Sequence, residues 1–402
     1  MSVWLAANIF VDLALSINQH LPGYVDAYFG PRDLSESVAR KGKVPIPELI
    51  DKASDLARSI AGDRELDDLR REYLAGQARA MQTTLRILAG ETLGIAEEVE
   101  GLYGVVPEWV DEASFDEAHR LHEDLLPGDG SLAERSQRFD KEMEVPAEVA
   151  APIIRELAQE FRARSLRRFR LPEIESCEFE FVHNKPWGAF NWYLGNYSSK
   201  IEVNLDIPIR LYTVPHIVAH EAYPGHHTEH AIKEKKLFRE GGHLEYCVPL
   251  SNAPSAALSE GIAEVSLEVI TSPEDRVDLQ RWALQKAGLT SVDPQRARDV
   301  LATWALLKHV GGNSILMLYG RGSSEDDVLS YLKRYWLSTD EEAAKGLDFI
   351  KDPLWRSYSF NYSIGYDLVK RLVRKNGRTD QWFCRLLEEP VSLAQVLRWI
   401  EQ

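Results

Sequence analysis

Residues 215–230 read PHIVAHEAYPGHHTEH, and the interpretation of the whole chain starts from this stretch. It holds five of the eleven histidines of the protein: His216, His220, His226, His227 and His230. Neutral imidazole is the commonest transition-metal ligand, and histidines grouped with carboxylates are what zinc sites require. The stretch therefore predicts a metal centre carried by helical segments.

The order of residues inside the stretch indicates which histidines bind. His220 and Glu221 supply the first half of the zincin motif His-Glu-x-x-His, in which the glutamate lies beside the metal-activated water. On an unbroken helix His227 would lie about 10 Å along the axis from His220, too far for one ion. Because Pro224 and Gly225 can break a helix, a later histidine can return to the metal. We favour His226, with His227 as the alternate ligand.

Two other pairings fit the same residues. His216 and His220 have the regular i,i+4 spacing of two ligands on one helical face. His226 with Glu229 and His230 forms the inverted pattern His-x-x-Glu-His. The first pairing places Glu221 after its second ligand, and the second leaves the His220-Glu221 pair unused. Both stay open as alternatives.

A third ligand is expected from a separate helix. Residues 255–270 (SAALSEGIAEVSLEVI) place Glu260 and Glu264 four residues apart on one face of an otherwise apolar helix. Carboxylates in apolar surroundings usually have a partner. Glu260 is the predicted ligand, and Glu264 the acceptor that holds an imidazole in one tautomer. We expect one Zn²⁺ per chain, although N/O ligands accept several divalent ions.

The rest of the chain is dominated by helical periodicity. Apolar residues recur at three- and four-residue steps between residues 63 and 90, and residues 114–126 and 146–169 behave similarly. Ser272, Ser323 and Thr339 are predicted helix N-caps. We expect a single mainly helical unit over residues 1–402, with a soft subdivision into residues 1–130 and 131–402.

Strand signals are confined to one region. Residues 178–182 (EFEFV) and 200–205 (KIEVNL) alternate with a period of two. They predict a small antiparallel ribbon bordering the zinc cleft, and the KIEVNL strand could bind an extended peptide by edge addition. The predicted fold class is therefore mainly α with a small β ribbon beside the active-site cleft.

Composition narrows the partners. The 402 residues carry 63 acidic and 47 basic side chains, a net charge of −16, which disfavours nucleic acid and anionic membranes. Three widely spaced cysteines fit a reducing compartment. The apolar N-terminus has no basic region and no small-residue cleavage site, so an amphipathic first helix and a cytoplasmic location are expected.

The motif resembles that of a known family. His-Glu-x-x-Pro-Gly-His-His, present at residues 220–227, is the hallmark of the bacterial domain-of-unknown-function family 885 (DUF885), whose members are regarded as zincin-like metallopeptidases. Residues 260–263 (EGIA) resemble the family's Glu-Gly-Trp-Ala element, with Ile262 in place of the aromatic residue. Residues 25–34 (VDAYFGPRDL) and 357–366 (SYSFNYSIGY) also resemble family elements. The resemblance implies a zincin-like helical metallopeptidase architecture.

These observations lead to one preferred mechanism. We expect zinc-dependent hydrolysis of short peptides, with Glu221 as general base and Tyr362 as the donor that stabilises the oxyanion. Asn191 and Asn196 are predicted to line the cleft, and Arg210 is a candidate for binding a substrate carboxylate, although an ordinary surface ion pair is the commoner role. The alternatives are a non-catalytic metal- or partner-binding scaffold and a hydrolase of a non-peptide amide or ester.

Overall fold

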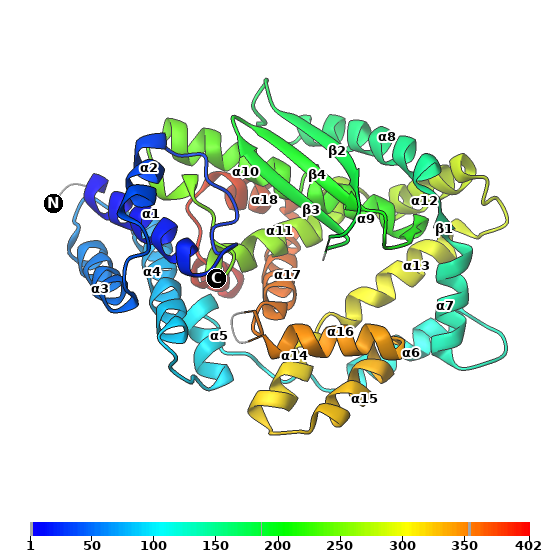
Figure 1. Cartoon of the computed structure of the whole chain (residues 1–402). Coiled ribbons are helices and arrows are strands. Elements are labelled where there is room, and N and C mark those ends of the chain that lie inside the picture. The colour runs from blue at the N-terminus through cyan, green and yellow to red at the C-terminus, as the bar shows by residue number, and fades with distance from the viewer. Residues whose placement is uncertain (1–2, 186, 353–354) are drawn as a thin grey trace.

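The computed structural model describes residues 3–185, 187–352 and 355–402. It is predominantly helical with a small sheet on one side, which confirms the predicted fold class (Figure 1). Residues 1 and 2 of the predicted first helix lie outside the described residues. Within those residues, we find no helix that combines the length and the apolar character needed to cross a bilayer.

The first helices build one end of the molecule. They are α1 (Val3–His20), α2 (Arg32–Lys41), α3 (Ile46–Gly62), α4 (Asp68–Leu88) and α5 (Ile95–Tyr103). The helix predicted between residues 63 and 90 is α4, and Asp67 caps its N-terminus by accepting from the amide of Arg70. Apolar faces of α1, α3 and α4 pack with residues 237–253 into one hydrophobic core.

The remaining helices surround a second, larger core. They are α6 (Ala113–Leu125), α7 (Leu132–Glu142), α8 (Ala147–Leu166), α9 (Val214–Glu221), α10 (His226–Lys233), α11 (Pro254–Ile270), α12 (Pro273–Ala287), α13 (Pro294–Trp304), α14 (Val310–Ile315), α15 (Glu325–Tyr335), α16 (Asp340–Lys351), α17 (Ser359–Val373), α18 (Thr379–Glu388) and α19 (Leu393–Glu401). The predicted segments 114–126 and 146–169 are α6 and α8. Ser272 and Thr339 cap α12 and α16 as predicted, whereas the cap of α15 is Ser324 rather than Ser323.

The sheet contains one strand more than predicted. β2 (Ser176–Val182) and β4 (Ser198–Asn204) are the two predicted strands, and β3 (Ala189–Gly195) lies between them in sequence. β3 and β4 form the antiparallel ribbon, while β2 and β4 pair in parallel because β3 reverses the chain once more. The short strands β1 (Glu144–Val145) and β5 (Ile209–Arg210) pair separately. The strand order β2-β4-β3 makes the KIEVNL strand central, so its edges are already paired.

The break between α9 and α10 follows from Pro224-Gly225. α9 ends at Glu221 and α10 begins at His226, so the helix is interrupted where the sequence predicts it. The amide of Gly225 donates to the carbonyl of Ala219 over 2.9 Å. A Cβ on Gly225 would lie 1.8 Å from the carbonyl oxygen of His220, so only glycine fits this turn.

α11 and α17 cross at the centre of the molecule (Figure 1). At Gly365 of α17 the two backbones touch, since a Cβ there would lie 1.8 Å from the carbonyl oxygen of Ala257 and 2.9 Å from the amide nitrogen of Gly261. Glu260 and Tyr362 belong to the same two helices on either side of this crossing. The close packing therefore fixes the relation between these two side chains.

Gly365→Ala is expected to destabilise the protein by about 1–3 kcal/mol or more, because the added methyl group must separate two helix backbones. Gly76→Ala in α4 is the matched control: its Cβ would meet only Pro254 at 3.5 Å, an ordinary contact. The free energy of unfolding of Gly76→Ala should equal that of wild type or exceed it by up to about 1 kcal/mol. Denaturant unfolding of both variants measures the difference, and equal stability of Gly365→Ala and wild type would contradict the packing argument.

Candidate metal centre

Many polar side chains line a cleft between the two hydrophobic cores. Tyr73 of α4 and residues 245–251 approach it from the first core, and α11 and α17 approach it from the second. Residues 189–191 of β3 form a further wall, and α9 and α10 supply its histidines. The predicted residues His220, Glu221, His226, Glu260 and Tyr362 all line this cleft.

Two imidazoles converge on one carboxylate oxygen in the cleft. Nε2 of His220 lies 3.6 Å from Oε2 of Glu260, and Nε2 of His226 lies 3.8 Å from the same atom. The ring centroids of His220 and His226 are 4.8 Å apart. Oε2 of Glu260 is buried and has no hydrogen-bond partner among the described residues. Such an oxygen lacks the cation or donor that burial requires.

This arrangement fits a divalent metal ion. Ligand atoms held about 2 Å from a tetrahedral ion lie roughly 3.3 Å from one another, close to the two measured separations. Each of the three residues offers one ligand atom, and these atoms all lie within 4.8 Å of one another. Three protein ligands would leave a coordination position open, as catalytic rather than structural zinc sites do.

The far side of the His226 ring is held by a chain of hydrogen bonds. Ser259 donates its hydroxyl proton to Oε2 of Glu229 over 2.5 Å, so its oxygen is left to accept from Nδ1 of His226 over 3.1 Å. Glu229 is further paired with Lys233 at 2.6 Å. The chain places the imidazole proton on Nδ1 and leaves the Nε2 lone pair free for a metal.

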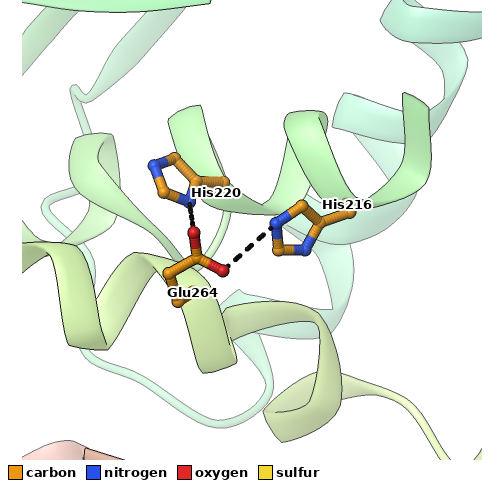
Figure 2. Close-up of side chains that lie close together, drawn as sticks. All are labelled: His216, His220 and Glu264. Atoms are coloured by element: carbon orange, nitrogen blue, oxygen red, sulfur yellow. Dashed lines mark ion pairs between the residues drawn. The ribbon is translucent and has the colours of Figure 1, made fainter. Parts of the chain in front are cut away.

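Glu264 supports His220 in a similar way. Figure 2 shows the Glu264 carboxylate between the two histidines of α9, with Oε1 lying 3.9 Å from Nδ1 of His220 and Oε2 lying 3.4 Å from Nε2 of His216. These three side chains form a second group compact enough for a metal. However, Nζ of Lys308 lies 2.6 Å from Oε2 of Glu264 and already supplies a cation. We therefore assign Glu264 to orienting His220 rather than to binding metal.

The pKa shifts in the cleft agree with a metal group at Glu260 and an orienting role for Glu264. Burial, together with the charges of Glu264 and Glu221, raises the pKa of Glu260 well above its usual range. Burial acts against ionisation of Glu264 too, but the Lys308 ammonium and the neighbouring imidazoles hold its pKa well below normal. Burial lowers the pKa of both His220 and His226, which keeps the imidazoles neutral, the form that binds metals.

Glu221 lies at the end of α9 beside this group. Its Oε1 is 4.0 Å from Nε2 of His220, and burial with the charges of Asp26 and Glu264 raises its pKa to about 8. Nδ2 of Asn191 donates to its backbone carbonyl over 2.7 Å, which ties the end of α9 to β3. A carboxyl whose pKa lies near neutral pH, beside a metal group, can both take up and release a proton in that range.

The alternate ligand, His227, lies outside the cleft and has other partners. Its side chain is fully buried, with Nε2 2.9 Å from Glu175 and Nδ1 2.8 Å from the hydroxyl of Ser199. Glu175 also accepts from Tyr223 and Arg162. Both nitrogens of His227 are therefore used in a structural network. The inverted pattern of His226, Glu229 and His230 does not leave its carboxylate available either, because Glu229 is bound to Lys233 and Ser259.

Tyr362 faces the metal group from α17. Its hydroxyl pKa is raised well above the usual range by the charge of Glu260 and by burial, so the group stays protonated and can donate. Tyr358 lines the same cleft, and the two rings meet edge to face at 5.9 Å. Tyr366 lies outside the cleft, where its hydroxyl accepts from Lys370.

Of the three predicted substrate-binding residues, only Asn191 lines the cleft. Asn196 lies at the β3–β4 turn, where its side chain accepts from Arg239 over 2.8 Å. Arg210 lines a separate apolar hollow and pairs with Asp140 at 3.3 Å, the ordinary ion pair. The edge strand beside the metal group is β3 rather than the KIEVNL strand, because β4 is paired on both sides.

Sequence reasoning missed three residues that support or face the site. Ser259 and Lys308 act through hydrogen bonds that no spacing rule predicts. Asp26 lies in the loop between α1 and α2 but lines the same cleft as Glu221. The resemblance of residues 25–34 (VDAYFGPRDL) to a family element could have pointed to Asp26, although the sequence alone gives this segment no role.

The fold and the site define a mainly helical protein with a His/Glu group able to hold a divalent metal. No family model matches the chain, and no curated protein matches its sequence. A solved structure described as "the putative lipoprotein from Colwellia psychrerythraea" is similar in fold, with a TM-score of 0.55 and 15% identity, covering 88% of this chain. The chain spans 66% of that protein's length.

Two further solved structures are more distant. A "putative lipoprotein of unknown function from Shewanella oneidensis" gives a TM-score of 0.46 at 14% identity, covering 92% of this chain and 76% of its own. The M32 carboxypeptidase from Deinococcus radiodurans R1 gives a TM-score of 0.38 at 11% identity, and the match covers 95% of this chain and 88% of that one. The first similarity supports the fold, and the cytoplasmic location stays a prediction.

Proposed function

We propose that this protein is a zinc-dependent hydrolase, specifically a metallopeptidase that acts on short peptides. The observation that carries the proposal is the convergence of two imidazole Nε2 atoms on an unpartnered, buried oxygen of Glu260. The DUF885-like motif at residues 220–227 supports the same conclusion from sequence. His220, His226 and Glu260 would hold the ion, in a ratio of one per chain.

Each remaining residue of the site has a chemical task in peptide hydrolysis. A bound zinc ion supplies Lewis-acid polarisation of the scissile carbonyl and activation of a water molecule. Glu221 accepts a proton from the attacking water and passes it to the leaving amine as the C–O bond forms and the C–N bond breaks. The Tyr362 hydroxyl donates to the carbonyl oxygen as negative charge develops there.

The shape of the cleft favours short substrates. It holds about 140 Å³ of free volume between the two hydrophobic cores, and helices surround it. The edge of β3 at residues 189–191 has no strand partner and lines the cleft, so it could pair with an extended peptide, the role predicted for the KIEVNL strand. A peptide a few residues long satisfies both features, whereas a folded protein does not.

A non-catalytic scaffold is the second candidate. A purely structural zinc site closes its fourth position with another ligand and needs no carboxylate poised as a base. Glu221, with a pKa raised to about 8 and its side chain in the cleft, argues against this role. Hydrolysis of a non-peptide amide or ester uses the same residues and is an outcome of the activity test below.

Tyr362→Phe is expected to lower the rate of hydrolysis about 10²-fold with unchanged zinc content, because it removes one oxyanion donor. Tyr366→Phe is the matched control, since Tyr366 contacts Lys370 outside the cleft. Steady-state kinetics of the two variants give the comparison. Equal rates for Tyr362→Phe and wild type would remove Tyr362 from the reaction.

The proposed function is tested with a mixed peptide library of two to eight residues. Zinc-loaded protein is incubated with the library, and products are identified by mass spectrometry against protein stripped by a chelator. We expect cleavage that requires zinc and returns when zinc is restored. Zinc-loaded protein that cleaves no peptide but hydrolyses amide or ester compounds would favour the non-peptide hydrolase. Absence of hydrolysis of both kinds would favour the scaffold.

A further inference from the structure

The cleft contains a carboxylate that the metal chemistry does not use. Asp26 lines the cleft together with Glu221 and Glu260. No side-chain donor pairs with its carboxylate in the part of the chain that the structure describes, and its charge reaches both neighbours, since it contributes to raising the pKa of Glu221 and Glu260. Burial and neighbouring carboxylates disfavour the ionised form of such a group, and a cationic ligand favours it.

Asp26 is held firmly in place by backbone contacts. Val25 forms an isolated antiparallel bridge with Leu250, and the amide of Asp26 donates to the carbonyl of Pro249 over 3.0 Å. Phe29, three residues further on, packs against Tyr193 of β3 with ring centroids 5.2 Å apart. The loop between α1 and α2 is thus fixed against both walls of the cleft.

Basic side chains pair with only some of the acidic groups that line the cleft. Among its described lining residues are five carboxylates, one lysine and no arginine. Lys233 neutralises Glu229, and Arg70, from behind the wall, binds Glu245 through two hydrogen bonds of 2.7 and 2.8 Å. The three other carboxylates, from Asp26, Glu221 and Glu260, have no lysine or arginine partner among the described lining residues.

A second, independent feature points to the same kind of ligand. The Asn191 side chain is only 7% exposed and lines the cleft, and its Oδ1 has no hydrogen-bond partner among the described residues. Because Nδ2 of Asn191 donates to the Glu221 carbonyl, the unpartnered atom of this side chain is the acceptor Oδ1. The described lining therefore contains unpartnered acceptors and no unpaired lysine or arginine with which to hold a substrate carboxylate.

We propose that Asp26 binds the α-ammonium group of the substrate, so that the protein acts on short peptides with a free N-terminus. This inference rests on the proposed metallopeptidase function and adds the substrate class. An ammonium group brings a positive charge and N–H donors to the Asp26 carboxylate, which has neither among the described residues. The absence of a free cation from the described cleft argues against recognition of a peptide C-terminus.

Binding of two zinc-directed probes tests the inference without turnover. Leucine hydroxamate and 4-methylpentanoyl hydroxamate have the same side chain and metal-binding group and differ in the α-amino group. On zinc-loaded protein, titration calorimetry should show the amine-bearing probe binding about 10- to 100-fold more tightly, the range of a hydrogen bond to a charged group. Asp26→Asn should abolish this preference, and Asp33→Asn, an exposed residue of α2, should keep it.

The outcomes separate the two proposals. Equal binding of both probes to zinc-loaded wild type, or a preference that survives in Asp26→Asn, overturns the role of Asp26 while leaving the metal centre intact. Failure of both probes to bind, together with a protein that takes up no zinc, overturns the proposed function and the inference with it. In the library, N-terminal acetylation should lower kcat/KM by a similar factor, and C-terminal amidation should not.

Discussion

Glu221→Gln is expected to lower the rate of hydrolysis by about 10²–10⁴-fold while zinc content stays at the wild-type value. Glutamine keeps the size of the side chain and its place at the end of α9, but it cannot accept a proton from water. Glu221 has no predicted ligand role, and its nearest imidazole atom, Nε2 of His220, is 4.0 Å away. The loss should therefore fall on kcat rather than on metal binding or folding.

The comparison for Glu221 needs a control with the same chemical change. Glu240 is exposed, pairs with Lys236 and lies outside the cleft, so Glu240→Gln should keep full activity. Rates and zinc content are measured on the same preparations. If Glu221→Gln retained wild-type hydrolysis, Glu221 would not be the base; if it lost zinc, Glu221 would belong to the metal ligands.

Replacing a ligand is expected to have the second large effect. His226→Ala and Glu260→Gln should each weaken zinc binding by more than the roughly 10- to 100-fold that follows the loss of an outer partner. Glu260→Gln is the more informative of the two, because it keeps the shape of the buried side chain and removes its charge. Competition with a chromogenic chelator gives the affinity, and hydrolysis should fall in parallel at limiting zinc.

His227→Ala is the matched control for His226→Ala, since the two histidines are adjacent. It should leave zinc affinity within a few-fold of wild type but destabilise the fold by about 3 kcal/mol, because the buried carboxylate of Glu175 loses one partner. Tyr223 and Arg162 still bind Glu175, which keeps the cost at the low end of the range. Loss of zinc in His227→Ala with retention in His226→Ala would reverse the ligand assignment.

Much of the site could be predicted because its geometry is local. The His220-Glu221 pair, the break at Pro224-Gly225 and the i,i+4 spacing of Glu260 and Glu264 are all set by neighbouring residues. The choice between His226 and His227 could not be made from neighbouring residues. It depends on where α10 begins and on a buried partner, Glu175, which lies 52 residues earlier in the chain. No spacing in the motif carries that information.

The errors in the sheet have a related cause. β3 was not predicted as a strand, because its sequence, Ala-Phe-Asn-Trp-Tyr-Leu-Gly, does not alternate between apolar and polar residues and places the polar Asn191 at a buried position. The structure gives that asparagine a task, since it binds the carbonyl of Glu221. Functional sites are where local rules are expected to fail. Asp26 was missed for another reason: contacts between residues far apart in the chain, such as the pairing of residues 25 and 250, bring its loop to the cleft.

Anomalous diffraction at the zinc edge, on crystals grown with zinc, tests the central claim most directly. The account predicts a single strong peak about 2.0–2.2 Å from Nε2 of His220, Nε2 of His226 and a carboxylate oxygen of Glu260. A peak between His216, Nδ1 of His220 and Glu264 would contradict it and move the metal to the group that Lys308 now neutralises. No peak in the cleft would contradict the metallopeptidase proposal as a whole.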